Sequence, residues 1–245
     1  MEGVAFSFRW RYALPASIIL FVGYLLMLQP KWVLNRLMHR SPEVLYSVDT
    51  DQKLIALTID DGPDPHSTEL ILDVLVQYDT HATFFVLIDR VNENETVIER
   101  MVTEGHELGN HLLQDTPSIQ HPKNEFESRL EHAHKSLSHF TEIRWFRPGS
   151  GWYNREMLQS MERFHYRLAL GSIYPFDSHI PSSWFASRYI VWRAHPGAII
   201  VLHDYGNRGE RTVDTLSYAL PILKERGYRI VTLSELIQTT TPEVD

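Results

Sequence analysis

The sequence predicts an α/β fold in which parallel strands are joined by helical crossovers, and three observations support this prediction. Short apolar runs rich in β-branched residues alternate with longer stretches whose apolar residues recur at helical spacing. Several of the short runs stop at polar residues, as strands covered on both faces do at the edge of a parallel sheet. The chain has 245 residues, 43% of them hydrophobic, which is enough for one sizeable core. If the sheet closes, the fold is a distorted (β/α) barrel.

The N-terminus is the clearest break in composition. Residues 12–28 (YALPASIILFVGYLLML) contain no charge and just reach the length of a membrane-spanning helix, so we expect a single N-terminal membrane anchor. The following QPKWVL has no small-x-small cleavage pattern, which favours an anchor over a cleaved signal peptide. A buried core helix is the alternative. We expect residues 1–42 to form the anchor and a juxtamembrane linker, and residues 43–245 to form the main folded domain. Its side of the membrane is undetermined, because basic residues flank both ends of the span.

Charge and cysteine content limit the classes of binding partner and the residue types that could bind a metal ion. Of the 23 Lys and Arg residues five lie in the first 42 residues, whereas only one of the 31 Asp and Glu residues does, so the rest of the chain is more acidic than the overall charge of −8. Such a domain repels phosphate backbones, which argues against nucleic acid. There is no cysteine, so a metal site would have to use His, Asp or Glu.

The elements follow in order from the apolar run LIALTI at residues 54–59. The later helices are marked by apolar residues on one face, and Asn124 with Glu127 resembles a capping box that opens one of them. The strands are short apolar runs bounded by turn residues. We expect strands over 54–59, 82–88, 106–110, 145–146, 166–170, 198–202 and 229–233, and helices over 70–78, 94–104, 124–140 and 216–223.

Two adjacent carboxylates, Asp60 and Asp61, end the first strand, and Gly62 and Pro63 then turn the chain. Like charges repel, so such a pair at the mouth of a core usually has a cation or a proton to stabilise it. The alternative is a polar strand-to-helix turn in which an Asp caps the helix.

Candidate chemical groups follow the later strands. His111 and Asp115 share one face if their turn is helical, and with Asp61 they would make a nitrogen and oxygen set suited to zinc or another divalent ion. The expected strand at 145–146 is followed by Arg147 and a glycine-rich turn. The arginine can hold a carboxylate, and the turn can direct backbone N–H groups at an oxyanion; the alternative is a structural turn. His203 ends a later strand and could be a general acid, or a core or surface histidine.

Taken in order, these residues resemble the polysaccharide deacetylases of the NodB type over about residues 54–237. The family's TFDDGP motif is similar to TIDDGP at 58–63, its H-[ST]-x-x-H motif to HLLQD at 111–115, and its RPPYG motif to RPGSG at 147–151. Its D-x-x-D-W motif is reduced to YPFDS at 174–178, and its L-x-H motif corresponds loosely to Leu202-His203.

The resemblance implies a distorted (β/α) barrel of the polysaccharide deacetylase type and a role for each matching residue. Asp60 would be the catalytic base, oriented by Arg147, and His203 the acid, paired with Asp177. The metal ligands would be Asp61, His111 and Asp115, where Asp115 stands in place of a histidine. The Ser150 N–H would stabilise the oxyanion, Leu202 would belong to the substrate side of the site, and Trp152 is a candidate to stack on a sugar ring.

The implied activity is hydrolysis of acetyl groups from an acetylated carbohydrate, most of all N-acetylglucosamine units of a chitin-like or peptidoglycan-like polysaccharide, with a divalent metal ion, expected to be zinc. The catalytic domain would lie outside the cytoplasm, with the polymer. Two alternatives remain. One is a non-catalytic, membrane-anchored carbohydrate-binding relative, and the other is an aspartate-nucleophile phosphotransferase, although such sites commonly use D-x-D rather than adjacent acids.

Overall fold

The computed structural model describes residues 17–18, 21–25, 28 and 30–239, and the chain divides into two compact units, Met1–Pro42 and Glu43–Asp245. In the first unit, the expected linker contains a helix instead, α2 (Lys31–Arg40). Pro30 precedes it with φ −64°, a value compatible with helix entry, and His39 and Arg40 lie in the last turn, where positive charge is favourable.

The expected membrane anchor, residues 12–28, falls largely outside the described residues. Among the helices of the described part, none combines the length and the apolar character required to cross a membrane.

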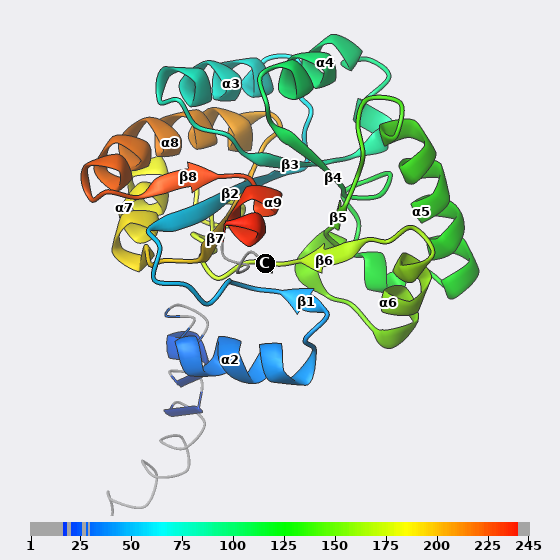
Figure 1. Ribbon diagram of the computed structural model, residues 1–245, viewed down its shortest axis with the longest axis horizontal. Coiled ribbons are helices and arrows are strands. Elements are labelled where there is room, and N and C mark those ends of the chain that lie inside the picture. The colour runs from blue at the N-terminus through cyan, green and yellow to red at the C-terminus, as the bar shows by residue number, and fades with distance from the viewer. Residues whose placement is uncertain (1–16, 19–20, 26–27, 29, 240–245) are drawn as a thin grey trace, which may run out of the picture. The chain divides into compact units, whose positions relative to one another are not determined.

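The second unit is built on a curled sheet of eight strands, and the paired strands of the described residues run parallel to one another. The order is β1-β6-β5-β4-β3-β2-β7, and β8 pairs with the first half of β2 (Figure 1). This arrangement confirms the predicted parallel α/β architecture. The strands are β1 (Val44–Leu45), β2 (Leu54–Asp60), β3 (Thr83–Val86), β4 (Glu107–Asn110), β5 (Trp145–Phe146), β6 (Arg167–Ala169), β7 (Ala198–His203) and β8 (Arg229–Val231).

The curl is completed by irregular backbone rather than by a regular strand. After β6, Ile173 forms an isolated parallel bridge with Ile200 of β7, and Ser172 N donates to the Ile199 carbonyl at 3.1 Å. The segment after β6 therefore meets β7, although these two strands lie far apart in the strand order. The result is the distorted, partly closed barrel that the sequence predicted.

Helices cover the outside of the curled sheet (Figure 1). Helix α5 begins after Pro122 and has no side-chain cap, so the predicted capping box of Asn124 and Glu127 is wrong. Strand β1 and helices α6, α7 and α9 were not predicted, because β1, α6 and α9 are short and the apolar residues of α7 do not gather on one face. The helices are α3 (Ser67–Gln77), α4 (Glu95–Thr103), α5 (Lys123–Leu137), α6 (Arg155–Glu162), α7 (Ser183–Arg193), α8 (Asn207–Glu225) and α9 (Leu233–Gln238), with short 3-10 turns at Ile88–Arg90, Ser118–Gln120 and Gly149–Gly151.

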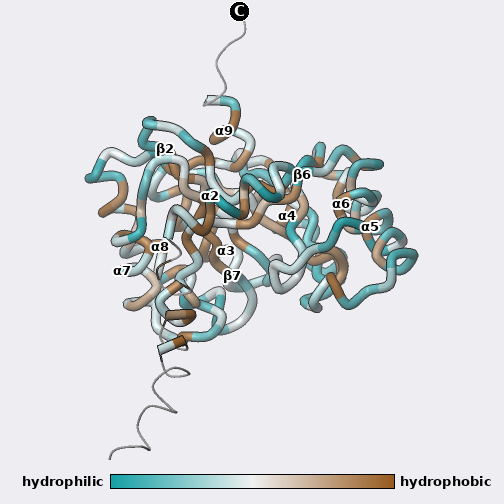
Figure 2. The backbone as a smooth tube through the Cα atoms, turned by 90° about the horizontal axis from the view of Figure 1, so that it is seen from below, coloured by the Kyte–Doolittle hydropathy of each residue, from teal (hydrophilic) through white to brown (hydrophobic). Residues whose placement is uncertain are grey.

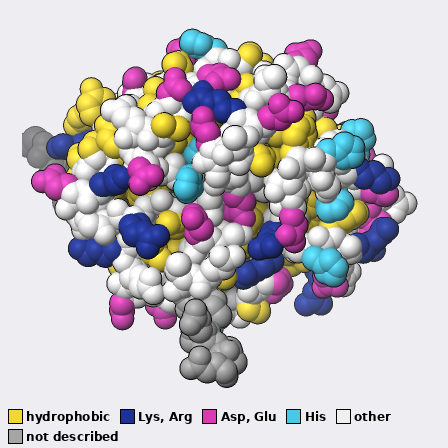
Figure 3. All heavy atoms as spheres, turned by 45° about the horizontal axis from the view of Figure 1, so that its top comes forward, with side chains coloured by type: hydrophobic (Ala, Val, Ile, Leu, Met, Phe, Trp, Pro, Cys, Tyr) yellow, Lys and Arg dark blue, Asp and Glu magenta, His cyan; other side chains and the backbone are white. Residues whose placement is uncertain are grey.

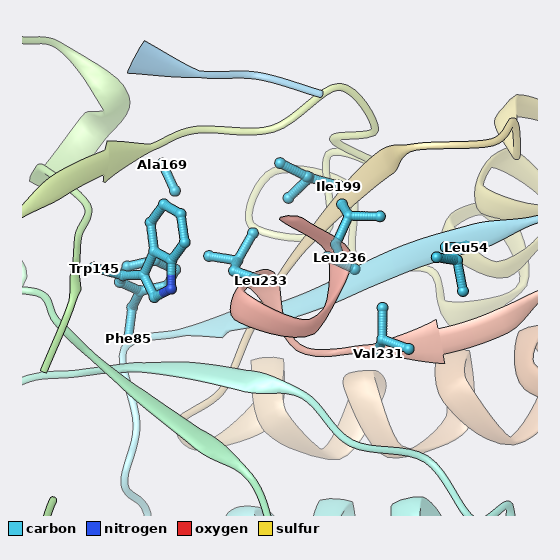
Figure 4. Packing of buried hydrophobic residues seen from close by; sticks show 9 residues of the cluster. Leu54, Phe85, Trp145, Ala169, Ile199, Val231, Leu233 and Leu236 are labelled. Atoms are coloured by element: carbon cyan, nitrogen blue, oxygen red, sulfur yellow. The ribbon is translucent and has the colours of Figure 1, made fainter. Parts of the chain in front are cut away.

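Helix α9 fills one end of the barrel interior. Its Leu233 and Leu236 point toward Leu54, Ile199 and Trp145 in a buried cluster (Figure 4). The hydrophobic segments gather in the strands at the centre of the molecule, as Figure 2 shows. This apolar plug leaves the opposite end, where the strands finish, for polar side chains.

Side-chain alternation along β2 then determines which residues reach that polar end. Leu54 and Ala56 belong to the interior cluster. Every second residue of a strand lies on the same face, so Thr58 and Asp60 also face the interior, nearer the end of β2. Asp60 is thus placed at the mouth of the barrel by strand geometry.

Candidate active site

The carboxyl ends of β2, β4, β5 and β7 bring the predicted site residues to one end of the barrel. Asp60 is the last residue of β2 and lies in register with His203, the last residue of β7. His111 follows β4 directly and Arg147 follows β5 directly. Parallel strands end on the same side of their sheet, so residues distant in sequence become neighbours.

Arg147 holds Asp60 in place. Its Nη1 lies 2.6 Å from Asp60 Oδ1 and also donates to Thr58 Oγ1 at 2.7 Å, and the side chains of both Arg147 and Asp60 are buried. The other guanidinium nitrogens donate to the carbonyls of Ala169 and Leu170 at 2.9 and 2.8 Å. Burial lowers the pKa of Arg147, and the charge of Asp60 opposes that shift. Every direction of the planar guanidinium is therefore fixed by a partner, and Asp60 is fixed with it.

His203 forms a second pair with the buried carboxylate of Asp177. The carboxylate oxygens lie 3.0 and 3.1 Å from His203 Nδ1, and one of them also accepts the His203 backbone N–H at 2.8 Å. Burial alone would lower the pKa of the imidazole, but the charge and hydrogen bond of Asp177, together with Asp60 and Asp61, raise it to about 9. His203 is consequently protonated at neutral pH. With Nδ1 facing Asp177, its other proton is on Nε2.

Asp61 and His111 form a third buried group. Asp61 has φ 73°, an unfavourable conformation for a non-glycine residue. The backbone turns here, so the Asp61 side chain does not follow the alternating pattern of β2. Its Oδ1 lies 3.4 Å from His111 Nε2, while His111 Nδ1 lies 2.7 Å from the Arg147 carbonyl. Burial would raise the pKa of Asp61, but the hydrogen bond and charge of His111, with His203 and Arg208, lower it to about 2.

Arg90 and Tyr205 support the turn that contains Asp61. Arg90 Nη1 donates to the Asp61 carbonyl, and the Arg90 guanidinium lies 3.5 Å from the centre of the Tyr205 ring. Leu87 N donates to the Gly62 carbonyl at 3.0 Å and ties the same turn to β3. Sequence reasoning missed Arg90, because it follows a strand in an ordinary surface-like 3-10 turn.

Arg208 is the second residue that the sequence analysis missed. It lies at the start of α8, and its Nη1 is 3.0 Å from Asp61 Oδ2 while its Nη2 is 3.3 Å from Asp115 Oδ2. Asp115 is therefore engaged with an arginine, and its side chain is 48% exposed. The only sequence signal was the short distance from His203 along the chain.

The expected three-residue metal set is not assembled as predicted. Within the described part of the chain, no group of three or more His, Cys, Asp and Glu side chains is placed to hold a metal ion. Two of the three expected ligands nevertheless fit such an ion. Asp61 Oδ2 is buried without a well-formed hydrogen bond, and the Arg147 carbonyl can hold His111 in the tautomer whose Nε2 is a donor to metal.

The remaining predicted residues lie around the mouth. Ser150 sits at φ 63° in the turn Gly149–Gly151, and Trp152 just after it is 68% exposed. Leu202 is fully buried in β7 in register with Ile59, so its side chain packs in the core and is not positioned to touch a substrate. Acidic and basic side chains are interspersed on the face shown in Figure 3.

Comparison with known proteins gives consistent matches. The family model described as polysaccharide deacetylase matches residues 47–169. A peptidoglycan-N-acetylglucosamine deacetylase of Bacillus cereus is 35% identical over 80% of this chain and 93% of its own length.

Two solved structures show the same fold. One is a family 4 acetyl xylan esterase from Clostridium thermocellum in complex with a cobalt ion, with a TM-score of 0.71 and 30% identity over 76% of this chain and 91% of that one. The other is a CE4 family pseudoenzyme from Bacillus anthracis, with a TM-score of 0.72 and 25% identity over 79% of this chain and 68% of that one. On its sequence and its fold, this chain belongs to the polysaccharide deacetylase family.

Proposed function

We propose that the protein hydrolyses acetyl groups from an acetylated carbohydrate, most of all from N-acetylglucosamine units of a polysaccharide, with a divalent metal ion, preferably zinc. The observation that carries this proposal is the presence of two ion pairs, Asp60–Arg147 and His203–Asp177, at one end of the barrel. One pair holds a carboxylate beside a fixed positive charge, and the other holds a histidine in its protonated form. Amide hydrolysis needs both a base and an acid of this kind.

Each residue then has a role that follows from its contacts. Asp60, whose Oδ1 is held by Arg147, accepts the proton of the attacking water. The left-handed turn at Ser150 offers its backbone N–H to the oxyanion. His203 donates its Nε2 proton to the leaving amine, since Nδ1 is engaged by Asp177. With a pKa of about 9, His203 remains protonated at neutral pH.

The metal ion would be held by Asp61 and His111, the two buried residues whose donor atoms face each other. When bound, a divalent ion supplies Lewis acidity for the acetyl carbonyl and for the water nucleophile. Zinc is proposed because a carboxylate oxygen and an imidazole nitrogen are both donors that it accepts well.

The relatives and the rim of the site support the proposed substrate class. The similar Bacillus cereus protein is named for peptidoglycan N-acetylglucosamine, and another relative, from Azorhizobium caulinodans, for chitooligosaccharide. Exposed Trp152 beside the Ser150 turn offers an aromatic face of the kind on which sugar rings stack.

We further propose that residues 12–28 anchor the protein in a membrane with its catalytic domain outside the cytoplasm. The absence of charge from this stretch and the location of such polymers support the proposal. Fractionation of cells and protease treatment of intact cells test it. Protein in the soluble fraction would refute the anchor, and a domain shielded until lysis would refute the orientation.

A non-catalytic carbohydrate-binding role is the second candidate, and the contact of Arg208 with Asp115 favours it, because it engages one of the three expected ligands. Acetate release separates the two. The full chain loaded with Zn²⁺ or Co²⁺ should release acetate from chitooligosaccharide, peptidoglycan or acetylated xylan, and Asp60→Asn should not do so at a comparable rate. Glycan binding without acetate release under any metal would favour the non-catalytic role.

A further inference from the structure

Arg208 is a cation already present at the carboxylate that the metal ion would use. Its two terminal nitrogens reach two different carboxylates, Asp61 Oδ2 at 3.0 Å and Asp115 Oδ2 at 3.3 Å. The Asp61 side chain is only 2% exposed, so its charge is poorly compensated by water. A guanidinium at this position therefore supplies the charge compensation that a divalent ion would otherwise give.

We propose that Arg208 is a built-in competitor for the divalent ion, and that its side chain must leave Asp61 and Asp115 before the ion binds. This inference rests on the proposed metal site at Asp61 and His111. It assigns to Arg208 the control of metal affinity, which neither the sequence motifs nor the comparisons assign.

The surroundings of Arg208 allow its side chain to leave. It is 27% exposed in the first turn of α8, and its second partner, Asp115, is half exposed, so that half of the bridge is a weak surface ion pair. Two residues before it, Gly206 has φ 54°, and no atom lies within 4 Å of the position that a Cβ would take there. The ion pair with the buried carboxylate of Asp61 is therefore the contact that an incoming ion has to replace.

Charge determines the sign of the effect. A cation about 3 Å from the ligand carboxylate repels a divalent ion that approaches the same group, and this repulsion is stronger at a buried site than in water. Removing the charge of Arg208 should therefore tighten metal binding. If Arg208 instead served only to orient Asp61 for the ion, its removal should weaken binding.

The test is metal affinity, measured without turnover. Zn²⁺ binding by calorimetry and Co²⁺ binding by absorbance are compared for the full-length wild type, Arg208→Gln, Arg208→Lys and Arg188→Gln. Arg188 is an exposed arginine on α7, so its replacement controls for the change in net charge. We expect Arg208→Gln to bind about tenfold tighter or more, and both other variants to stay within about threefold of the wild type.

A second measurement uses the wild type alone. Phenylglyoxal modification of Arg208, followed by peptide mass spectrometry, should become several-fold faster when Zn²⁺ is added, because the guanidinium leaves its carboxylates. If Arg208→Gln binds the ion no more tightly than the wild type does, the role of Arg208 is wrong and the metal site still stands. If that variant does not fold, an unchanged modification rate of the wild type leads to the same conclusion. Absence of metal binding by both the wild type and Arg208→Gln would instead refute the metal site, and this inference with it.

Discussion

Replacing Asp177 with Asn should shift the alkaline limit of activity toward neutral pH. The carboxylate of Asp177 touches His203 Nδ1 at 3.0 and 3.1 Å and is the largest of the causes that raise the His203 pKa to about 9, against the lowering effect of burial. Asn has the same size and retains one acceptor oxygen. The substitution therefore removes the charge with little change of shape.

The magnitude follows from that pKa. Loss of an opposite charge in direct contact lowers a histidine pKa by about 1 to 3 units, which places the variant near pH 7. At pH 8, a group with a pKa of about 9 is about 90% protonated, and one with a pKa of about 7 is about 10% protonated. Since His203 must be protonated to donate to the leaving amine, kcat/KM at pH 8 should fall about ninefold more than at pH 6.

The assay is kcat/KM for acetate release between pH 5 and 10, for wild type and Asp177→Asn loaded with the same metal. The wild type should lose activity as pH rises through about 9. Stability should follow the same sign, because a raised folded-state pKa gives stability that is complete below the unfolded value of 6.5 and is lost as pH rises through about 9. An alkaline limb unchanged by Asp177→Asn would refute the assignment of His203 as the acid held charged by Asp177.

Four further substitutions test separate parts of the site and of its supporting turn. Asp60→Asn should lower kcat about 10²- to 10⁴-fold while metal content stays constant, and near-normal turnover would exclude Asp60 as the base. His111→Ala should abolish binding of the divalent ion in calorimetry, whereas full occupancy would remove His111 from the ligand set. Asp115→Ala should weaken binding about tenfold only if Asp115 becomes a ligand. Gly149→Ala should destabilise the protein by about 1–3 kcal/mol in denaturant unfolding, because the new Cβ would lie 2.1 Å from the Thr116 carbonyl oxygen, and a stability equal to wild type would contradict this close approach.

Local pattern was sufficient to predict most of the sheet. The runs at 54–59, 145–146 and 198–202 each form a strand within one or two residues of the expected bounds, because buried parallel strands need continuous apolar side chains. The helix over Lys31–Arg40 and the uncapped start of α5 were not predicted correctly. In both cases a proline precedes the helix, and its restricted φ starts the helix without a side-chain cap.

The sequence by itself determined which residue types stand at the strand ends, and so the candidates Asp60, Asp61, His111, Arg147 and His203. Strand register and the common direction of parallel strands then place them together, and both follow from apolar patterning.

The resemblance implied the pairs Asp60–Arg147 and His203–Asp177, but only the tertiary structure decided the partners of Arg208. The pairing of Arg208 with Asp61 and Asp115 joins α8 to two distant loops, and no local pattern marks a surface-like arginine as the partner of a buried carboxylate. The same holds for Leu202, which a motif placed at the substrate but which the alternation of β7 turns into the core. Contacts between segments far apart in sequence depend on how the sheet curls, and that geometry is set by packing of the whole chain rather than by neighbouring residues.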